Sequence, residues 1–269
     1  MFIFDAHCDT LSTGRPLWRN EGHVDIERLR DRGPGIQVMA AFGKDQLTQL
    51  DRLSAVSDSF NCSLLPAVEG GDTIQSLSDL KPFLARKPVF FSLTWNHDNA
   101  LAGGCRGSGG GLTPLGRDVI KALEDAGALI DLSHASEHTF WEALVTCKLP
   151  PVVTHACCAA LCPHPRNLTD HQLKALAQAG GVLGVTFYPP FLTGSDDASA
   201  DDVIRHISHA VDIMGAGHVG LGSDFDGCEI LPAGLSGVQD VPALIKSLPF
   251  SYEETELIAG GSFLQIVAL

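Results

Sequence analysis

Eight short apolar runs of strand length recur along this chain, and they limit its possible folds more than any other feature. Runs of this length with Gly or Pro close by are typical of buried parallel strands. They cover residues 2–6, 35–41, 62–68, 89–94, 128–133, 152–154, 181–186 and 219–223. Several are separated by segments with helical spacing, such as 115–126, 170–179 and 200–214. This alternation predicts an α/β fold, a closed (β/α)8 TIM-like barrel.

The length of the chain agrees with a single barrel domain over residues 1–269. The 269 residues give roughly 34 per βα unit, and about 250 residues are typical of this barrel. The last stretch, 252–267, has an acidic first turn followed by apolar residues, which predicts a final helix that closes the barrel wall. Residues 8–33 and 228–250 lack clear periodicity, and we expect loops and short helices there.

Composition and charge argue against some partners. Hydrophobic residues make up 45% of the chain and mean hydropathy is +0.13, yet no apolar stretch is long enough to span a bilayer. The first residues lead into the first strand without a basic segment or a small-residue cleavage site, so we expect a cytoplasmic protein without a secretory signal. The net charge of −14 argues against nucleic acid as a partner.

Two local features invite other interpretations. The eight cysteines are expected to be reduced packing residues, because we expect no secretory signal. Cys157, Cys158 and Cys162 form a local cluster, but without a CxxC pair a structural zinc site there is disfavoured. The glycine-dense stretch 103–111 (GGCRGSGGG) lacks the GK[ST] ending of a phosphate loop, so we expect a mobile surface loop near the barrel mouth.

Several strand candidates end in side chains that bind metals. His7 and Asp9 follow the first run, and because strand side chains alternate, they share one side while Cys8 points away. His134 and His155 end consecutive runs, and imidazole nitrogen is a good zinc ligand at neutral pH. The carboxyl ends of all strands meet at one face of such a barrel, where active sites lie. The pattern therefore predicts a metal site at that face.

Two carboxylates and one arginine add chemistry to this face. Glu69 ends its run, and a carboxylate can bridge two cations about 3.5 to 4 Å apart, the separation that two-metal hydrolysis uses. Asp224 follows the eighth run and can serve as a proton shuttle. Arg166 can hold a carboxylate with its planar guanidinium. Together these residues predict a two-metal hydrolase.

A local motif offers a rival interpretation. Residues 134–138 (HASEH) match H-x-x-E-H, the inverted zinc-protease signature, which would make Glu137 the catalytic base. That chemistry needs both histidines on one helix face, whereas 130–133 has the pattern of a strand. We therefore disfavour this interpretation and expect Glu137→Ala to lose little activity.

The order of these motifs resembles the membrane (renal-type) dipeptidase family, zinc peptidase family M19. The resemblance covers nearly the whole chain. Its landmarks are 5–9 (DAHCD), 68–71 (VEGG), 92–96 (SLTWN), 111–116 (GLTPLG), 130–134 (IDLSH), 155–167 and 222–227 (GSDFDG). The resemblance implies a zinc-dependent dipeptidase with two Zn²⁺ per chain. It assigns His7 and Asp9 to one zinc and His134 and His155 to the other, with Glu69 bridging both.

The resemblance also implies roles around the metals. Asp224 matches the family's acid/base aspartate, and Arg166 matches the arginine that binds the free carboxylate of the dipeptide. The two zinc ions would activate a shared water as the hydroxide that attacks the peptide bond. A homodimer is suggested by analogy, whereas the membrane attachment of mammalian members is not carried over.

Some positions depart from the family pattern or belong to the expected pocket. Trp95 stands where mammalian members have a His that is thought to contact the scissile carbonyl, and His97, two residues on, is a candidate substitute. If Trp95 replaces that His, its indole N–H must help to stabilise the oxyanion. Tyr188 and Phe187 are expected to line the substrate pocket.

Two other classes of function stay open at this point. One is a binuclear metal amidohydrolase that acts on N-acyl amino acids or cyclic amides, which the metal ligands alone would allow. The other is a barrel that binds metal or ligand without turnover. The presence of Asp224 argues against the second class, because a pure binding site needs no proton shuttle.

Overall fold

The eight predicted runs form a closed parallel barrel in the computed structural model, which describes residues 1–56 and 61–267. Neighbouring strands follow chain order, and β1 closes against β8 where Asp5 pairs with Leu221. The strands are β1 (Ile3–Asp5), β2 (Gly35–Phe42), β3 (Cys62–Glu69), β4 (Phe90–Ser92), β5 (Leu129–Asp131), β6 (Val152–Ala156), β7 (Val182–Val185) and β8 (Val219–Leu221). The predicted fold class is confirmed.

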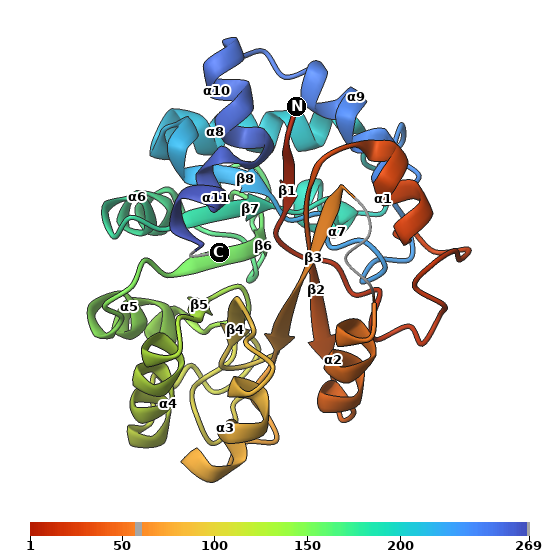
Figure 1. Ribbon diagram of the computed structural model, residues 1–269. Coiled ribbons are helices and arrows are strands. Elements are labelled where there is room, and N and C mark those ends of the chain that lie inside the picture. Colours follow the sequence, from red (N-terminus) through yellow and green to blue (C-terminus); the bar gives the residue numbers. More distant parts are fainter. Residues whose placement is uncertain (57–60, 268–269) are drawn as a thin grey trace.

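Helices surround the barrel (Figure 1). They are α1 (Ile26–Arg32), α2 (Gln46–Ser54), α3 (Leu77–Leu84), α4 (Pro114–Asp125), α5 (Glu137–Thr146), α6 (Asp170–Gln178), α7 (Pro189–Leu192), α8 (Ala200–Met214), α9 (Val241–Lys246), α10 (Tyr252–Glu256) and α11 (Ser262–Ile266), with 3-10 turns at Ala216–His218 and Val238–Asp240. The predicted helices at 115–126, 170–179 and 200–214 are α4, α6 and α8, and their ends agree within one residue.

Local capping explains why these helices begin and end where they do. The Thr113 side chain accepts a hydrogen bond from the Gly116 amide and starts α4. Thr169 and Gln172 form a reciprocal capping box that starts α6. The last turn of α8 is followed by Gly215 at φ 82°, a left-handed conformation that glycine adopts without a Cβ penalty.

The predicted final helix differs from the structure. Residues 252–267 form α10, a π-helical segment at Leu257–Gly261 and then α11, with Gly260 outside helical geometry. A Cβ on Gly260 would lie 2.8 Å from the backbone nitrogen of Phe4. The helix is interrupted here because the backbone at Gly260 approaches β1 too closely to leave room for a Cβ.

The interior of the barrel is apolar near the amino ends of the strands. The Phe263 ring of α11 stacks on Phe4 at a centroid distance of 5.3 Å and lies 5.9 Å from Phe90. Ile36 and Val152 belong to the same buried cluster. This cluster closes the amino end of the barrel, which leaves the carboxyl ends of the strands for polar side chains.

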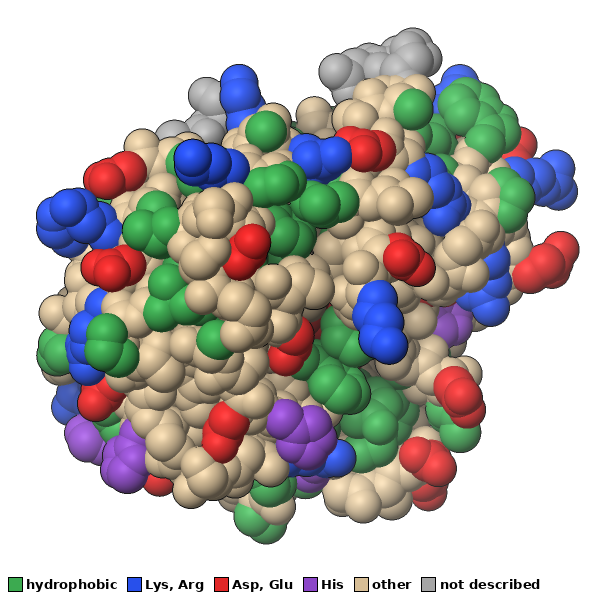
Figure 2. Space-filling model, turned by 90° about the horizontal axis from the view of Figure 1, so that it is seen from below, with side chains coloured by type: hydrophobic (Ala, Val, Ile, Leu, Met, Phe, Trp, Pro, Cys, Tyr) green, Lys and Arg blue, Asp and Glu red, His purple; other side chains and the backbone are tan. Residues whose placement is uncertain are grey.

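The cysteines and the surface agree with the composition of the chain. All eight cysteines are free thiols and six are buried, as expected for reduced packing residues. Figure 2 shows acidic, basic and apolar side chains interspersed on one face of the molecule. Within residues 1–56 and 61–267, no helix combines the length and apolar character needed to cross a bilayer.

Candidate metal centre

The metal-capable side chains meet at the carboxyl ends of the strands. His7 and Asp9 follow β1, Glu69 is the last residue of β3, His134 follows β5, His155 lies in β6 and Asp224 follows β8. The register of β2 and β3 places Glu69 opposite Phe42 at the rim. A cavity of about 560 Å³ opens there and is lined by Asp9, Glu69, His134, His155, Arg166 and Asp224, among others.

One group of ligand atoms gathers around Glu69. Its Oε1 atom lies 2.7 Å from Nε2 of His134 and 3.5 Å from Nε2 of His155, and the two imidazole nitrogens are 3.0 Å apart. All three side chains are buried. The Oε2 atom of Glu69 lies 3.9 Å from Nε2 of His7, so the two carboxylate oxygens face different histidines.

The hydrogen bonds behind the two histidines fix their tautomers. Nδ1 of His134 lies 3.1 Å from the amide oxygen of Asn96, which can only accept a hydrogen bond. Nδ1 of His155 lies 2.9 Å from the Thr154 hydroxyl, which itself donates to Asp131 at 2.7 Å. Both Nδ1 atoms therefore carry the hydrogen, so both Nε2 lone pairs point at Glu69. Arg166 Nη2 also lies 3.2 Å from His134 Nε2. Two lone pairs and a carboxylate oxygen that converge in this way are a suitable ligand set for a cation.

A second group surrounds His7. Its Nε2 atom lies 3.8 Å from Asp9 Oδ1 and 3.9 Å from Asp224 Oδ1. His7 Nε2 and Asp9 Oδ1 are buried and have no hydrogen-bond partner within residues 1–56 and 61–267. Buried polar atoms are nearly always paired, so these two orphaned atoms at such separations fit a cation between them.

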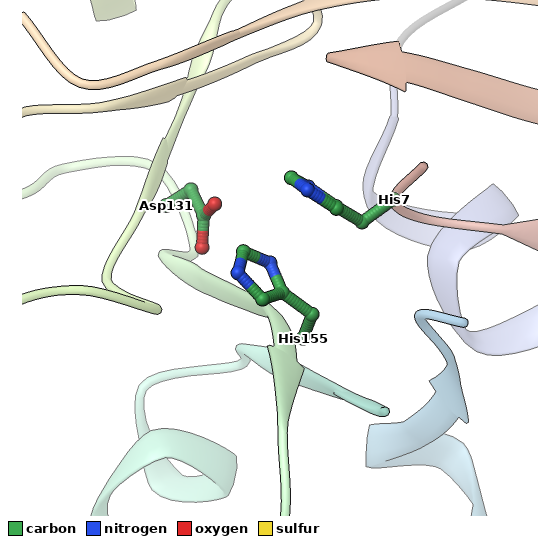
Figure 3. A group of neighbouring side chains, drawn as sticks. All are labelled: His7, Asp131 and His155. Carbon is green, nitrogen blue, oxygen red and sulfur yellow. The ribbon is translucent and has the colours of Figure 1, made fainter. Parts of the chain in front are cut away.

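Asp131 lies next to these ligands but is already saturated. Figure 3 shows its carboxylate beside the imidazoles of His7 and His155, and the three residues form a group that could hold a metal. The carboxylate accepts from the hydroxyls of Ser92, Ser133 and Thr154 and from the amides of Ser133 and Thr154. Five donors occupy the lone pairs of the carboxylate, so Asp131 orients its neighbours instead of binding a metal.

The pKa shifts of the buried carboxylates and histidines also favour a bound cation. Burial raises the pKa of Glu69 and of Asp9, and burial together with the Asp9 charge raises the pKa of Asp224 to about 8. Burial and nearby positive charges hold the pKa of His134 and His155 well below the usual value. Burial alone would lower the pKa of His7, but the surrounding carboxylates raise it to about 10. The residues present fit divalent metal ions, which would supply the missing positive charge.

Asp224 is held in an unusual backbone conformation. Its φ is 61°, in the left-handed region that non-glycine residues rarely adopt, and its amide donates to the carbonyl of His7. A Cβ on Gly227 would lie 2.4 Å from Asp224 Oδ1 and 2.2 Å from Asp9 Oδ2. Glycine at 227 thus leaves the space that both carboxylates occupy.

Arg166 lines the cavity beside the two histidines. Its Nη2 atom lies 3.2 Å from Nε2 of His134 and donates to the carbonyl of His155 at 3.2 Å, and its guanidinium lies over the Phe191 ring at 5.2 Å. The Nη1 atom is buried and has no hydrogen-bond partner in the part of the chain that the structure describes. A buried, unpaired guanidinium nitrogen that lines a cavity is suited to an anionic group of a ligand.

The predicted pocket residues divide into two sets. Trp95 and Tyr188 line the cavity. His97 is exposed and Phe187 is buried against Phe225, so neither lines it. The expectation that His97 or Phe187 contributes to the pocket is not supported. Asn96 lines the cavity instead, and its side chain is hydrogen-bonded to His134.

The rival protease motif does not form. His134 precedes α5, which begins after the N-cap residue Ser136, so His134 and His138 do not share a helix face. His138 is exposed and its Nδ1 bonds the carbonyl of Gly109. Glu137 does not line the cavity.

Further residues at or near the cavity were not predicted from the sequence. Asn96 and Thr154 hydrogen-bond the candidate ligands His134 and His155, and Asp131 holds Thr154. Arg106 and His164 line the cavity from loops. Asp131 could have been noticed in the sequence, because it is a charged residue inside an apolar strand, three positions before the candidate ligand His134. The others carry no local pattern.

The closed barrel and the buried histidine–carboxylate cluster define the class of metal-dependent hydrolase barrels. Within that class, the chain belongs to the membrane dipeptidase family, peptidase family M19, whose family model matches residues 45–268.

Curated relatives include proteins named as dipeptidases. Two uncharacterized dipeptidases of Schizosaccharomyces pombe are 29% identical over 97% of this chain and 36% identical over 72% of it. An uncharacterized Klebsiella pneumoniae protein from the pqqA 5′ region is 41% identical over 63% of the chain. The matches span 67%, 49% and 66% of these three relatives' own lengths.

Solved structures share the fold. A metallo peptidase from Rhodobacter sphaeroides, solved with a phosphinate mimic of the dipeptide L-Ala-D-Ala, has a TM-score of 0.86 and 22% identity, with 98% of each chain covered. A dipeptidase of family M19 has a TM-score of 0.87 and 23% identity over 98% of this chain and 97% of its own. An amidohydrolase from Pseudomonas aeruginosa has a TM-score of 0.86 and 19% identity, with 99% and 95% covered.

Proposed function

We propose that this protein is a zinc-dependent dipeptidase that hydrolyses the peptide bond of dipeptides. The main support is a buried guanidinium nitrogen of Arg166, which has no partner among the described residues and lies in the same cavity as the histidine–carboxylate cluster. Arg166 would pair with the free C-terminal carboxylate of the substrate. The scissile bond of a dipeptide lies one residue away from that carboxylate, which brings it towards the cluster.

Two zinc ions would be held by the two groups of side chains. His7 and Asp9 would bind one ion, His134 and His155 the other, and the two oxygens of Glu69 would bridge them. Neutral imidazoles and carboxylates are ligands that zinc accepts. Zinc bound there would supply Lewis-acid chemistry, which activates a water molecule and polarises the peptide carbonyl.

The chain's own residues would handle the proton and the substrate. Asp224 lines the cavity, where it can take a proton from the water and deliver it to the departing amine. Before it takes up that proton, the Asp224 carboxylate gives one side of the cavity negative charge, which suits the ammonium group of the dipeptide. Trp95 and Tyr188 would contact the substrate side chains.

A second candidate is a binuclear amidohydrolase that acts on N-acyl amino acids or cyclic amides. It is favoured by the fold shared with an amidohydrolase from P. aeruginosa, and Arg166 would also hold the carboxylate of an N-acyl amino acid. Such substrates lack the ammonium group. The acidic side of the cavity near Asp224 therefore favours dipeptides over N-acyl amino acids.

Zinc content and turnover together test the proposal. We expect about two zinc ions per chain and hydrolysis of Ala-Ala, with N-acetyl-Ala cleaved far more slowly. Asp224→Asn should lower kcat by about two orders of magnitude or more, because it cannot transfer the proton. The matched control Asp118→Asn changes an exposed aspartate of α4 and should leave turnover unchanged. Faster cleavage of N-acetyl-Ala than of Ala-Ala would favour the second candidate.

A further inference from the structure

The glycine-dense loop at 103–111 presents an arginine to the cavity. Arg106 lines the cavity although its side chain is largely exposed. The loop backbone is held at Arg106 and at the residue before it: the Cys105 amide donates to the carbonyl of His134, and the Arg106 amide donates to the carbonyl of Asn96 at 2.7 Å. The position of Arg106 is therefore tied to the strand ends that carry the candidate ligands.

Asp98 and the glycines explain how this loop holds its shape. The Asp98 carboxylate accepts from the amide of Gly104 and from the amide and hydroxyl of Ser108. A Cβ on Gly104 would lie 2.6 Å from the carbonyl oxygen of His97, and one on Gly107 would collide with the Asp98 carboxylate. The glycines are needed for close backbone approach, so the loop is a built part of the cavity wall.

His164 adds a second donor to the same wall. Its Nδ1 accepts from the amide of Arg166 at 3.1 Å, so in the neutral ring the hydrogen is on Nε2. The ring packs against Phe191 with centroids 4.4 Å apart. Burial, followed by the charges of Arg166 and Arg106, lowers the pKa of His164, which agrees with a neutral ring close to both guanidiniums.

The cavity wall formed by Arg106, His164 and Arg166 has more hydrogen-bond donors than a single carboxylate needs. Arg166 has its buried Nη1 free, and among the described residues Arg106 has no ion pair and no side-chain hydrogen bond. A dipeptide with an apolar C-terminal residue would occupy Arg166 alone. The guanidinium of Arg106 and the Nε2–H of His164 would then face the C-terminal side chain, and both only donate.

We propose that Arg106 and His164 form a second carboxylate subsite, which selects dipeptides whose C-terminal residue is aspartate or glutamate. This inference rests on the proposed function, because it takes the C-terminal carboxylate to lie on Arg166. A bidentate or charge-assisted contact with Arg106 would favour an acidic side chain over its neutral amide isostere.

Equilibrium binding tests the subsite without turnover. The zinc-loaded Asp224→Asn protein is titrated calorimetrically with Ala-Glu and with its isostere Ala-Gln. We expect Ala-Glu to bind about five- to tenfold more tightly, a modest ratio because Arg106 is exposed. Adding Arg106→Gln should bring the ratio to about one. The matched control Arg19→Gln, at an exposed arginine outside the cavity wall, should keep it.

The outcomes separate this inference from the proposed function. Equal binding of Ala-Glu and Ala-Gln would overturn the subsite, even if the wild-type enzyme hydrolyses Ala-Ala. A preference for Ala-Glu that survives Arg106→Gln would also overturn it, because the selectivity would then come from elsewhere. Selective, Arg106-dependent binding without hydrolysis of any dipeptide would support the subsite and refute the proposed function.

Discussion

At the scale of single residues, the candidate metal site depends on groups that never touch the metal. Asp131 and Asn96 accept hydrogen bonds that set which nitrogen of His155 and His134 is free. The ligand candidates themselves could be predicted, because each ends an apolar strand. Their supporting residues could not, because Asn96 and Thr154 look like ordinary loop and strand residues until the fold brings them beside the imidazoles.

Replacement of Thr154 tests this support. Thr154→Val keeps the size of the side chain but removes the acceptor of the His155 Nδ1 hydrogen. We expect zinc affinity to fall by about 10- to 100-fold, the usual effect of losing such an outer contact. Competition with a chromophoric chelator measures it. Thr255→Val, at another buried threonine far from the cavity, is the control, and equal affinity in both variants would contradict the proposed role of Thr154.

At the scale of elements, strands and long helices follow local patterns closely, and the exceptions are places where distant segments meet. α8 agrees with the prediction at both ends because its apolar spacing and the following Gly215 are local signals. The stretch 252–267 carries equally helical residues, yet it is broken at Gly260 by contact with β1. Such a contact has no signature in the sequence around Gly260.

The break at Gly260 gives a stability prediction. Gly260→Ala would bring a Cβ to 2.8 Å from the Phe4 backbone nitrogen, so β1 or the π-helical segment must shift. We expect a loss of about 1 to 3 kcal/mol in the free energy of unfolding, the typical cost of overpacking. Gly217→Ala is the control, since nothing lies within 4 Å of its added Cβ. Chemical denaturation of both variants measures the difference, and a stable Gly260→Ala protein would argue against close packing at this point.

At the scale of the whole molecule, closure of the barrel brings together residues from both ends of the chain. His7 and Asp224 come within 3.9 Å because β1 pairs with β8. The eight-strand count made this convergence predictable. The arrangement of the loops around the cavity was harder to predict from the sequence. Arg106 and His164 reach the cavity from loops whose paths depend on tertiary hydrogen bonds.

The crowding of carboxylates predicts a pH dependence after metal removal. The pKa of Asp224 is raised to about 8 in the folded chain, above the value of about 3.9 expected when unfolded. Between these values the folded protein binds more protons, so its stability falls as pH rises. Since His134 and His155 have the opposite effect, the Asp224 contribution is the difference from Asp224→Asn: we expect the melting temperature of chelator-treated wild type to drop relative to that of the variant between about pH 4 and 8. The same slope in both proteins would contradict the assignment.

Anomalous X-ray diffraction at the zinc edge, from crystals of the zinc-loaded protein, locates the metal ions directly. We expect two zinc peaks at the carboxyl ends of the strands, one beside His7 and Asp9 and one beside His134 and His155, both next to Glu69. A single peak, or two peaks of which one lies away from Glu69, would contradict this expectation.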